Sequence, residues 1–209
     1  MTIDFSGGPL VTVWFDYTCP HCHIGLQRLD VLSQELAFTI DRRPYLLRPS
    51  APLNDVLART CPADTPLPAD DSSGPRPPLK SPGDNSGPEP FSSRSLSTVL
   101  VHEVTACARE QGKDGDFYLE AAGEYWRRCT DLGNIFTLRR AAITAGLDWG
   151  SVWPKVESGH YRPWVMAEHW AAVDRGVRGV PSYLIGGRML TGDIGLDDLR
   201  SAIQNAEGT

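Results

Sequence analysis

The first part of the sequence predicts a strand, a helix and a second strand in close succession, which strongly limits the possible folds. Leu10 to Phe15 is rich in β-branched and aromatic residues, as buried strands are. From Ile24 to Leu36, apolar residues recur mostly at the three-to-four spacing of one helix face. Phe38 to Arg43 alternates and predicts the second strand. A unit of this size pairs its strands in parallel, so the fold class is α/β.

The rest of the chain is helical in pattern and returns to strands only at its end. Four amphipathic stretches occur between Ser95 and Gly176 with no strand pattern between them. They cover Leu96 to Ala108, Phe117 to Trp126, Leu138 to Ala145 and Trp164 to Val173. Next, two short strand patterns flank Gly186-Gly187, which predicts a β-hairpin from Ser182 to Leu190. A final helix is expected from Leu196 to Ile203.

The middle of the sequence contains a segment of unusual composition. Pro62 to Pro90 holds nine of the chain's 17 prolines and has no aromatic residue. Such a segment does not bury enough apolar surface to offset the entropy lost on ordering. We therefore expect three parts. An α/β domain comprises residues 1–61 and 177–209, a mobile loop covers 62–94, and an inserted all-helical subdomain covers 95–176.

Charge and hydropathy exclude several classes of protein. The chain has 20 basic and 26 acidic residues, a net charge of −6, whereas a nucleic-acid-binding protein normally presents a basic face. The N-terminus lacks the positive and apolar segments of an export signal, and no apolar run is long enough to span a membrane. These features predict a cytoplasmic protein that binds neither nucleic acid nor membrane.

The motif Cys19-Pro20-His21-Cys22 lies between the first strand and the first helix. Residues three apart share a helix face, so the two sulfurs come within bonding distance. Pro20 suits the first helical turn, where its missing N–H would be unpaired anyway. Cys19 is placed at the helix N-terminus, where free amides and the helix dipole stabilise a thiolate, and His21 adds a nearby charge or hydrogen bond. The pattern predicts redox chemistry, with Cys19 attacking and Cys22 resolving.

Three other interpretations of these residues stay open. With His23 the motif also fits covalent haem attachment, for which Met166 and Met189 are the internal candidates for the distal ligand. A structural zinc site would need four ligands, but the other cysteines form no second closely spaced pair. Finally, two thiols can simply be buried in a core. The helix-start position and the Pro-His pair favour redox chemistry, with no metal.

Three further cysteines stand outside the motif. Cys107 and Cys129 lie on apolar helical stripes and are expected to be core thiols. Cys61 stands next to the proline-rich segment, and we hypothesise that it forms a second, regulatory disulfide.

Pro181 stands directly before the hairpin and lacks an N–H. A proline there is compatible with a cis bond whose neighbouring backbone faces a substrate, but taken alone these residues favour a trans proline in an ordinary turn. Val-Pro before a strand is weak evidence when taken alone.

Taken together, Phe15 to Gly25, Arg43 to Leu47 and Gly176 to Gly187 resemble the DsbA family of thioredoxin-fold oxidoreductases. The wider pattern is most similar to its cytosolic FrnE-like branch, related to 2-hydroxychromene-2-carboxylate isomerases and kappa-class glutathione transferases. The resemblance does not extend to residues 62–90. It implies a thioredoxin-like fold with an inserted helical subdomain.

The resemblance also implies roles for individual residues. Cys19 corresponds to the nucleophilic cysteine, Cys22 to the resolving one and His21 to a dipeptide position that tunes the reduction potential. Pro181 corresponds to a cis-proline facing the active site, and Val180 to the residue whose backbone pairs with bound substrate. Pro20 and Tyr17 are further candidates for substrate contact.

The predicted function is a thiol–disulfide oxidoreductase that acts through a mixed disulfide on protein or small-molecule thiols and disulfides. Its redox-active disulfide is Cys19–Cys22, no other cofactor is expected, and glutathione is a compatible co-substrate. Two alternatives stay open. One is a glutathione-dependent transferase or isomerase of a small molecule, with a pocket lined by tryptophans, namely Trp149, Trp153, Trp164 and Trp170. The other is a non-catalytic module that binds a partner. A homodimer is compatible with the sequence.

Overall fold

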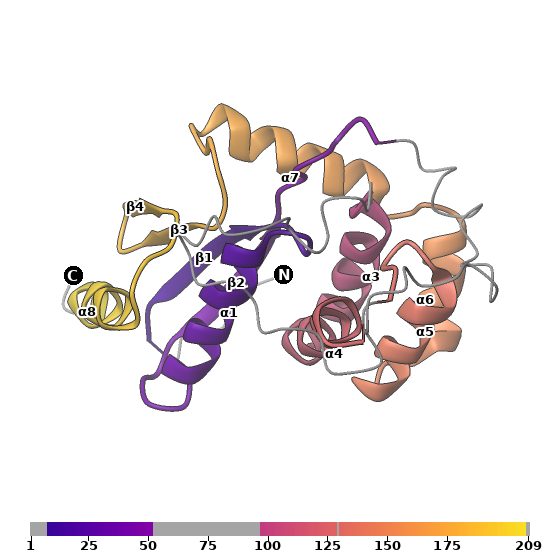
Figure 1. Ribbon diagram of the computed structural model, residues 1–209, viewed down its shortest axis with the longest axis horizontal. Coiled ribbons are helices and arrows are strands. Elements are labelled where there is room, and N and C mark those ends of the chain that lie inside the picture. The colour runs from indigo at the N-terminus through magenta and orange to yellow at the C-terminus, as the bar shows by residue number, and fades with distance from the viewer. Residues whose placement is uncertain (1–7, 52–96, 129, 208–209) are drawn as a thin grey trace, which may run out of the picture. The chain divides into compact units, whose positions relative to one another are not determined.

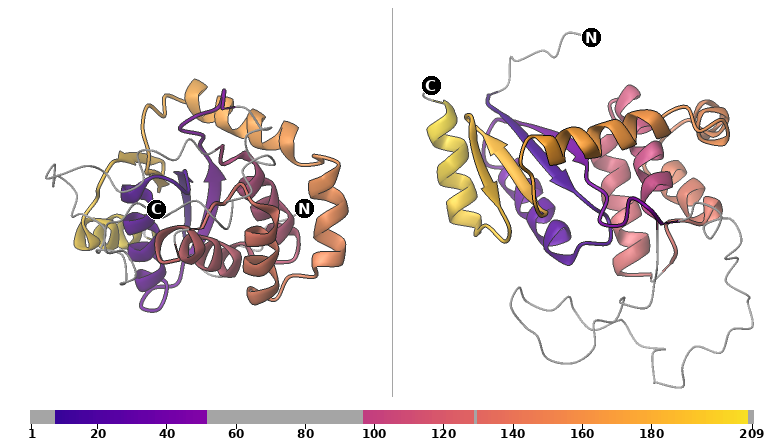
Figure 2. Two further views of the ribbon diagram at one scale, coloured as in Figure 1. Left: turned by 45° about the vertical axis from the view of Figure 1, so that its right-hand side comes forward. Right: turned by 90° about the horizontal axis from the view of Figure 1, so that it is seen from above.

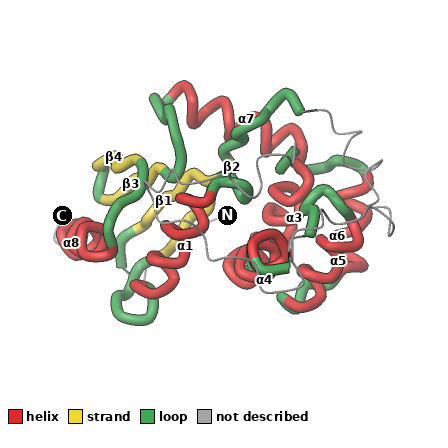
Figure 3. Tube along the Cα trace, viewed as in Figure 1, coloured by secondary structure: helices red, strands yellow, loops and turns green. Residues whose placement is uncertain are grey.

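The computed structural model describes residues 8–51, 97–128 and 130–207, and the proline-rich segment lies outside these ranges. These ranges contain four strands and seven helices, in an order that confirms the predicted succession of strand, helix, strand, helices, hairpin and helix (Figures 1 and 3). The elements are β1 (Leu10–Phe15), α1 (Pro20–Leu32), β2 (Thr39–Pro44), α3 (Val99–Glu110), α4 (Asp114–Trp126), α5 (Ile135–Thr144), α6 (Trp149–Glu157), α7 (Arg162–Asp174), β3 (Ser182–Ile185), β4 (Arg188–Thr191) and α8 (Leu196–Glu207).

The four strands form one mixed sheet in the order β2-β1-β3-β4. Strand β1 pairs with β2 in parallel, as the sequence predicts, with Leu10 opposite Thr39. It pairs with β3 in the antiparallel sense, with Val13 opposite Tyr183. The predicted two-residue turn between β3 and β4 is confirmed: Gly186 and Gly187 have φ values of +54° and +78°, which favour glycine.

Helices cover both faces of this sheet. Alternation along β1 directs Trp14 to one face, where it packs against Ala172 of α7 and Val177. Val13 and the residues two before and two after it on β1 point to the other face. Helices α1 and α8 cover this face, and α8 contacts both α1 and β3. Figure 2 shows α1 and α8 together on the side of the sheet opposite to the end of α7. The N-terminus of α1 therefore lies close to the C-terminal end of β1 and the N-terminal end of β3.

The chain divides into two compact units. The first consists of Met1–Leu47 and Ala167–Thr209 and contains the sheet with α1 and α8, whereas the second is Arg48–Met166 and contains α3 to α6. Helix α7 begins in the second unit and ends in the first. Within the described ranges, no helix is long and apolar enough to cross a membrane.

The number of helices expected between Ser95 and Gly176 is wrong, because the structure has five there and the sequence analysis predicted four. The missed helix is α6. Its start is marked by Asp148, whose side chain accepts a hydrogen bond from the Gly150 amide as an N-cap. The apolar spacing of Trp149, Val152 and Val156 is also helical, but the tryptophans were considered only as packing residues of the helical subdomain or as the lining of a pocket.

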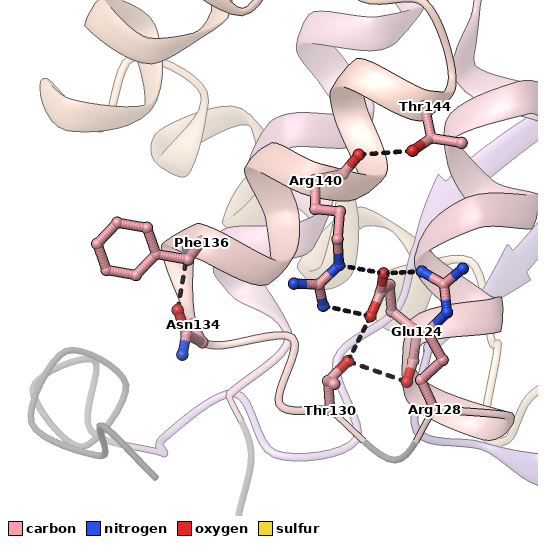
Figure 4. A network of polar contacts seen from close by, with 7 residues as sticks. All are labelled: Glu124, Arg128, Thr130, Asn134, Phe136, Arg140 and Thr144. Atoms are coloured by element: carbon pink, nitrogen blue, oxygen red, sulfur yellow. Dashed lines mark hydrogen bonds and ion pairs between the residues drawn. The ribbon is translucent and has the colours of Figure 1, made fainter. Parts of the chain in front are cut away.

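The second unit contains a buried ion-pair network around Glu124 on α4 (Figure 4). The Arg140 guanidinium donates to both carboxylate oxygens at 2.7 and 2.6 Å, and Arg128 and Thr130 donate at 2.6 and 2.9 Å. These hydrogen bonds, led by those from Arg140, lower the pKa of Glu124 to about 2. The carboxylate is fully paired, so the network ties α4 to α5 rather than forming a site for chemistry.

We expect Glu124→Gln to lower the free energy of unfolding at neutral pH by about 2 kcal/mol. The loss is no larger than this because the two arginine side chains are 61% and 48% exposed and stay solvated without the carboxylate. The difference in the free energy of unfolding between wild type and variant has its full value above the pKa of an unfolded glutamate, about 4.3. It disappears as the pH falls towards about 2, where Glu124 becomes protonated in the folded protein. Chemical denaturation at several pH values measures it, with Glu120→Gln on the same helix as the control. An equal loss at pH 7 and pH 2 would contradict this assignment.

Candidate active site

Cys19 caps the N-terminus of α1. Its backbone is extended (φ −85°, ψ 116°), and its sulfur accepts a hydrogen bond from the Cys22 amide, with N···Sγ 3.3 Å. The helix begins at Pro20, as the missing N–H predicts. The helix starts here because the cysteine side chain fills the role that a serine or aspartate usually takes at this position. The sulfur therefore lies where the helix amides point, which is the place that best stabilises an anion.

A second segment reaches the same sulfur from far along the sequence. The Cys19 thiol donates to the Val180 carbonyl oxygen, with Sγ···O 3.5 Å. The peptide bond between Val180 and Pro181 is cis, and Pro181 is buried. Strand β3 begins at the next residue, so its pairing with β1 brings this segment to the end of β1 where α1 begins. The sequence analysis placed these residues at the site only through the family resemblance.

The turn between β1 and α1 is braced by Asp16, which the sequence analysis did not single out. Its buried carboxylate accepts from the Thr18 amide at 2.8 Å, the Thr18 hydroxyl at 2.7 Å and the Leu47 amide at 2.9 Å. Its carbonyl accepts from the Cys19 amide at 3.2 Å. The neighbouring Leu46 amide donates to Nδ1 of buried His169 at 3.1 Å. An aspartate two residues before a threonine is a common local turn signal, but the long-range bond to Leu47 cannot be read from sequence.

The two cysteines have opposite electrostatic character. A hydrogen bond from the Cys22 thiol is the largest cause that lowers the pKa of Cys19, helped by the amides of Cys22 and His21. Burial and the Asp16 charge oppose this effect, and the net direction is downward. Burial raises the pKa of Cys22 well above its usual value, and the interaction with Cys19 raises it further. Cys19 is thus the more acidic thiol of the pair and Cys22 the less acidic one.

The other predicted site residues lie at different depths. His21 is half-buried in the first turn of α1, and its Nδ1 is buried without a hydrogen-bond partner. Pro20, which precedes it, is half-buried as well. Tyr17 is only 2% exposed, and its ring packs edge-on against Phe15 at 5.1 Å between centroids. Its side chain therefore belongs more to the core than to the surface near Cys19.

Tyr183 and Gly25 are two further residues at the site that the sequence analysis did not identify. Tyr183 on β3 is completely buried and points to the face covered by α1. A Cβ atom on Gly25 would lie 2.0 Å from the Tyr183 hydroxyl oxygen and 3.4 Å from Cγ of Pro181. Glycine is therefore required at this point of α1 because the phenol ends against the helix backbone. No local sequence pattern reveals such a contact.

Of the other cysteines, Cys107 belongs to the second unit. Cys107 is a buried free thiol on α3, and burial raises its pKa to about 11. Cys61 and Cys129 lie outside the described residues. Trp149 and Trp153 stack on each other in the second unit, and Trp170 is half-exposed in the first. Among residues 8–51, 97–128 and 130–207, no three acidic, histidine or cysteine side chains are placed to hold a metal ion.

Comparisons with known proteins agree with this architecture. The model of the DSBA-like thioredoxin domain family matches residues 10–67 and 87–204. YwbO from Bacillus subtilis (strain 168) is 23% identical over 203 residues, which are 94% of this chain and 96% of YwbO. A probable DsbA oxidoreductase from Streptomyces coelicolor superposes with a TM-score of 0.66 at 18% identity, covering 96% of this chain and 90% of the other. A 2-hydroxychromene-2-carboxylate isomerase gives 0.62 at 17% identity, covering 96% and 99%.

The mixed sheet, the helices on both of its faces and the cysteine pair at the start of α1 define a protein of the thioredoxin-fold class. More particularly, the chain belongs to the family of DSBA-like thioredoxin domains. This membership confirms the predicted family and the α/β fold class.

We expect Gly25→Ala to lower the free energy of unfolding by about 1–3 kcal/mol, because the new methyl group must displace the Tyr183 phenol. In a Tyr183→Phe background the nearest remaining atoms are 3.3 and 3.4 Å away, so the same change should cost much less. Gly123→Ala on α4 is the matched control, since the only close atoms belong to the flexible, exposed Arg127 side chain. Denaturant titration of five proteins gives the comparison: the wild type, Gly25→Ala, Tyr183→Phe, the double variant and Gly123→Ala. Equal losses in both backgrounds would refute the contact.

Proposed function

We propose that this protein is a thiol–disulfide oxidoreductase whose reacting group is the Cys19 thiolate. The observation that carries the proposal is the asymmetry of the two thiols. Cys19 is stabilised as an anion by the start of α1, whereas Cys22 is buried and protonated within the same helical turn. A nucleophile beside a protected second thiol is the arrangement that disulfide exchange requires. Family membership supports a substrate that contains thiols or a disulfide.

The reaction follows from these positions in two exchange steps. The Cys19 thiolate attacks one sulfur of a substrate disulfide, a mixed disulfide forms, and the other substrate sulfur leaves with the electron pair of the broken bond. Cys22 then loses its proton and attacks Cys19. The Cys19–Cys22 disulfide forms, the second substrate sulfur leaves as a thiolate, and it takes up a proton. The substrate is reduced by two electrons and the cysteine pair is oxidised by two. The reverse sequence oxidises a substrate dithiol.

Residues around Cys19 are assigned to substrate contact in this proposal. While Cys19 is protonated, the Val180 carbonyl accepts its thiol hydrogen. Once Cys19 is a thiolate, that carbonyl is released to accept a backbone N–H from a bound substrate beside Pro181. His21 has a buried Nδ1 with no partner and can donate to a thiolate or to the substrate. Pro20 is half-buried in the same turn and offers an apolar contact to the substrate. Tyr17 is buried and stabilises the turn through its packing against Phe15.

The direction of electron flow depends on the thiolate. Any interaction that stabilises the Cys19 anion stabilises the reduced form, so the pair should be more oxidising than thioredoxin. In a reducing cytoplasm, which we propose as its location, the protein would rest mostly as the dithiol. No cofactor beyond the cysteine pair is needed, and glutathione is a suitable small co-substrate. Protein or small-molecule thiols and disulfides are the proposed partners.

Cys22→Ala should convert the protein into a trap for its substrates. Without the resolving thiol, the mixed disulfide on Cys19 persists and is seen as a reducible adduct on non-reducing gels and by mass spectrometry of an oxidised lysate. Cys107→Ala keeps the motif and should form no lasting adducts, which controls for loss of a buried thiol. We expect the wild type to reduce insulin disulfides, and we expect the rate of the Cys22→Ala protein to be lower by at least about tenfold.

Absence of adducts in Cys22→Ala, together with no insulin reduction by the wild type, would overturn the proposal. If the wild type instead conjugated glutathione to an electrophile or isomerised a chromene carboxylate, the transferase or isomerase alternative would replace it. The isomerase named above shares the fold and is therefore a useful reference in the same assay.

A further inference from the structure

The hydroxyl group of Tyr183 has no explanation in the folding of the sheet. The residue is completely buried, yet its hydroxyl oxygen has no hydrogen-bond partner. Leaving such a group unpaired destabilises the folded state, and phenylalanine would fill nearly the same volume without that cost. A buried unpaired hydroxyl therefore calls for a state of the protein in which it has a partner.

The position of the hydroxyl points to Cys22 as that partner. Tyr183 lies opposite Val13 in the β1–β3 pair and extends towards α1, where its hydroxyl abuts Gly25. Gly25 is three residues after Cys22, so the two share one face of the helix. That face is directed at the sheet, because Cys22 is 1% exposed and Leu26 and Leu29 beside it are fully buried. Burial is the main cause that raises the pKa of the Tyr183 phenol, and the negative charges of Cys22 and Cys19 raise it further.

We propose that the Tyr183 hydroxyl donates a hydrogen bond to the Cys22 sulfur when Cys22 becomes a thiolate during resolution of the mixed disulfide. Tyr183 is then a catalytic residue of the resolving step, because its hydroxyl contacts the reacting Cys22 sulfur, and this assignment rests on the proposed function. In that step Cys22 releases its proton, its electron pair forms the bond to Cys19, and the substrate sulfur leaves with the electrons of the old bond and accepts a proton. Tyr183 keeps its own proton throughout.

The step needs such a donor because the surroundings disfavour an anion at Cys22. Burial and the Asp16 charge both raise the pKa of Cys22. The other charged groups that act on Tyr183 are Arg28 on α1 and Asp193 after β4, which form an ion pair with each other and have opposite effects on the phenol. His21 and His23 are the sequence neighbours of Cys22 on α1 and therefore project from other sides of the helix.

The test separates the two exchange steps with an aromatic disulfide, 5,5′-dithiobis(2-nitrobenzoate), as the probe. Attack by Cys19 releases a first equivalent of coloured thionitrobenzoate, and resolution by Cys22 releases the second. We expect Tyr183→Phe to leave the first phase within about twofold of wild type and to slow the second about tenfold at neutral pH, since a hydrogen bond to a charged group contributes that much. The difference should narrow at alkaline pH, where Cys22 ionises in both proteins.

The controls distinguish the possible failures. Tyr45→Phe removes a phenol hydroxyl from the opposite face of the sheet, where Tyr45 packs near Trp14 and Ala172, and should leave both phases unchanged. Two results would overturn the assignment. In the first, the rate of the second phase in Tyr183→Phe equals that of the wild type at every pH. In the second, this rate is lower than that of the wild type by the same factor at every pH. A wild-type protein that releases only the first equivalent and stays labelled overturns the proposed function instead.

Discussion

The hydrogen bond from the Cys22 amide to the Cys19 sulfur is the contact on which the site depends. In the proposed function it lets one side chain serve as both the N-cap of α1 and the reacting thiol. The free amides of a helix start need an acceptor, and a thiolate is a better acceptor than a thiol, so forming the helix favours ionisation. Asp16 fixes the preceding turn through Thr18 and Leu47, which sets where the helix begins. Under the proposed function, folding of this turn and stabilisation of the Cys19 anion are therefore the same event.

The same geometry explains why the two cysteines differ although they lie one helical turn apart. Cys19 faces the amides of the first turn and the Val180 carbonyl, whereas Cys22 points into the layer between α1 and the sheet. Burial stabilises a neutral thiol there, which protects it from premature reaction. In the proposed exchange reaction, burial slows the resolving step unless a hydrogen-bond donor supports the Cys22 anion, and we propose the unpaired Tyr183 hydroxyl as that donor.

Sequence patterns predicted those features that depend on local spacing. The β-branched run of β1, the glycine turn of the hairpin and the cysteine-proline start of α1 each have a physical cause within a few residues. Features that depend on tertiary contact were missed, such as the bond from the Leu47 amide to Asp16 and the phenol against Gly25. Helix α6 was missed for a different reason: its apolar spacing is helical, but its tryptophans also suit a pocket.

Equilibration of the protein with glutathione buffers of graded ratio tests the central claim most directly, with rapid alkylation and mass spectrometry to count the thiols at each ratio. Our account predicts one reversible two-electron transition that links Cys19 to Cys22, at a potential less negative than that of thioredoxin, which is about −270 mV. Three results would contradict this account: the two thiols never form a disulfide with each other, Cys19 stops at a mixed disulfide with glutathione, or the potential of the transition is more negative than that of thioredoxin.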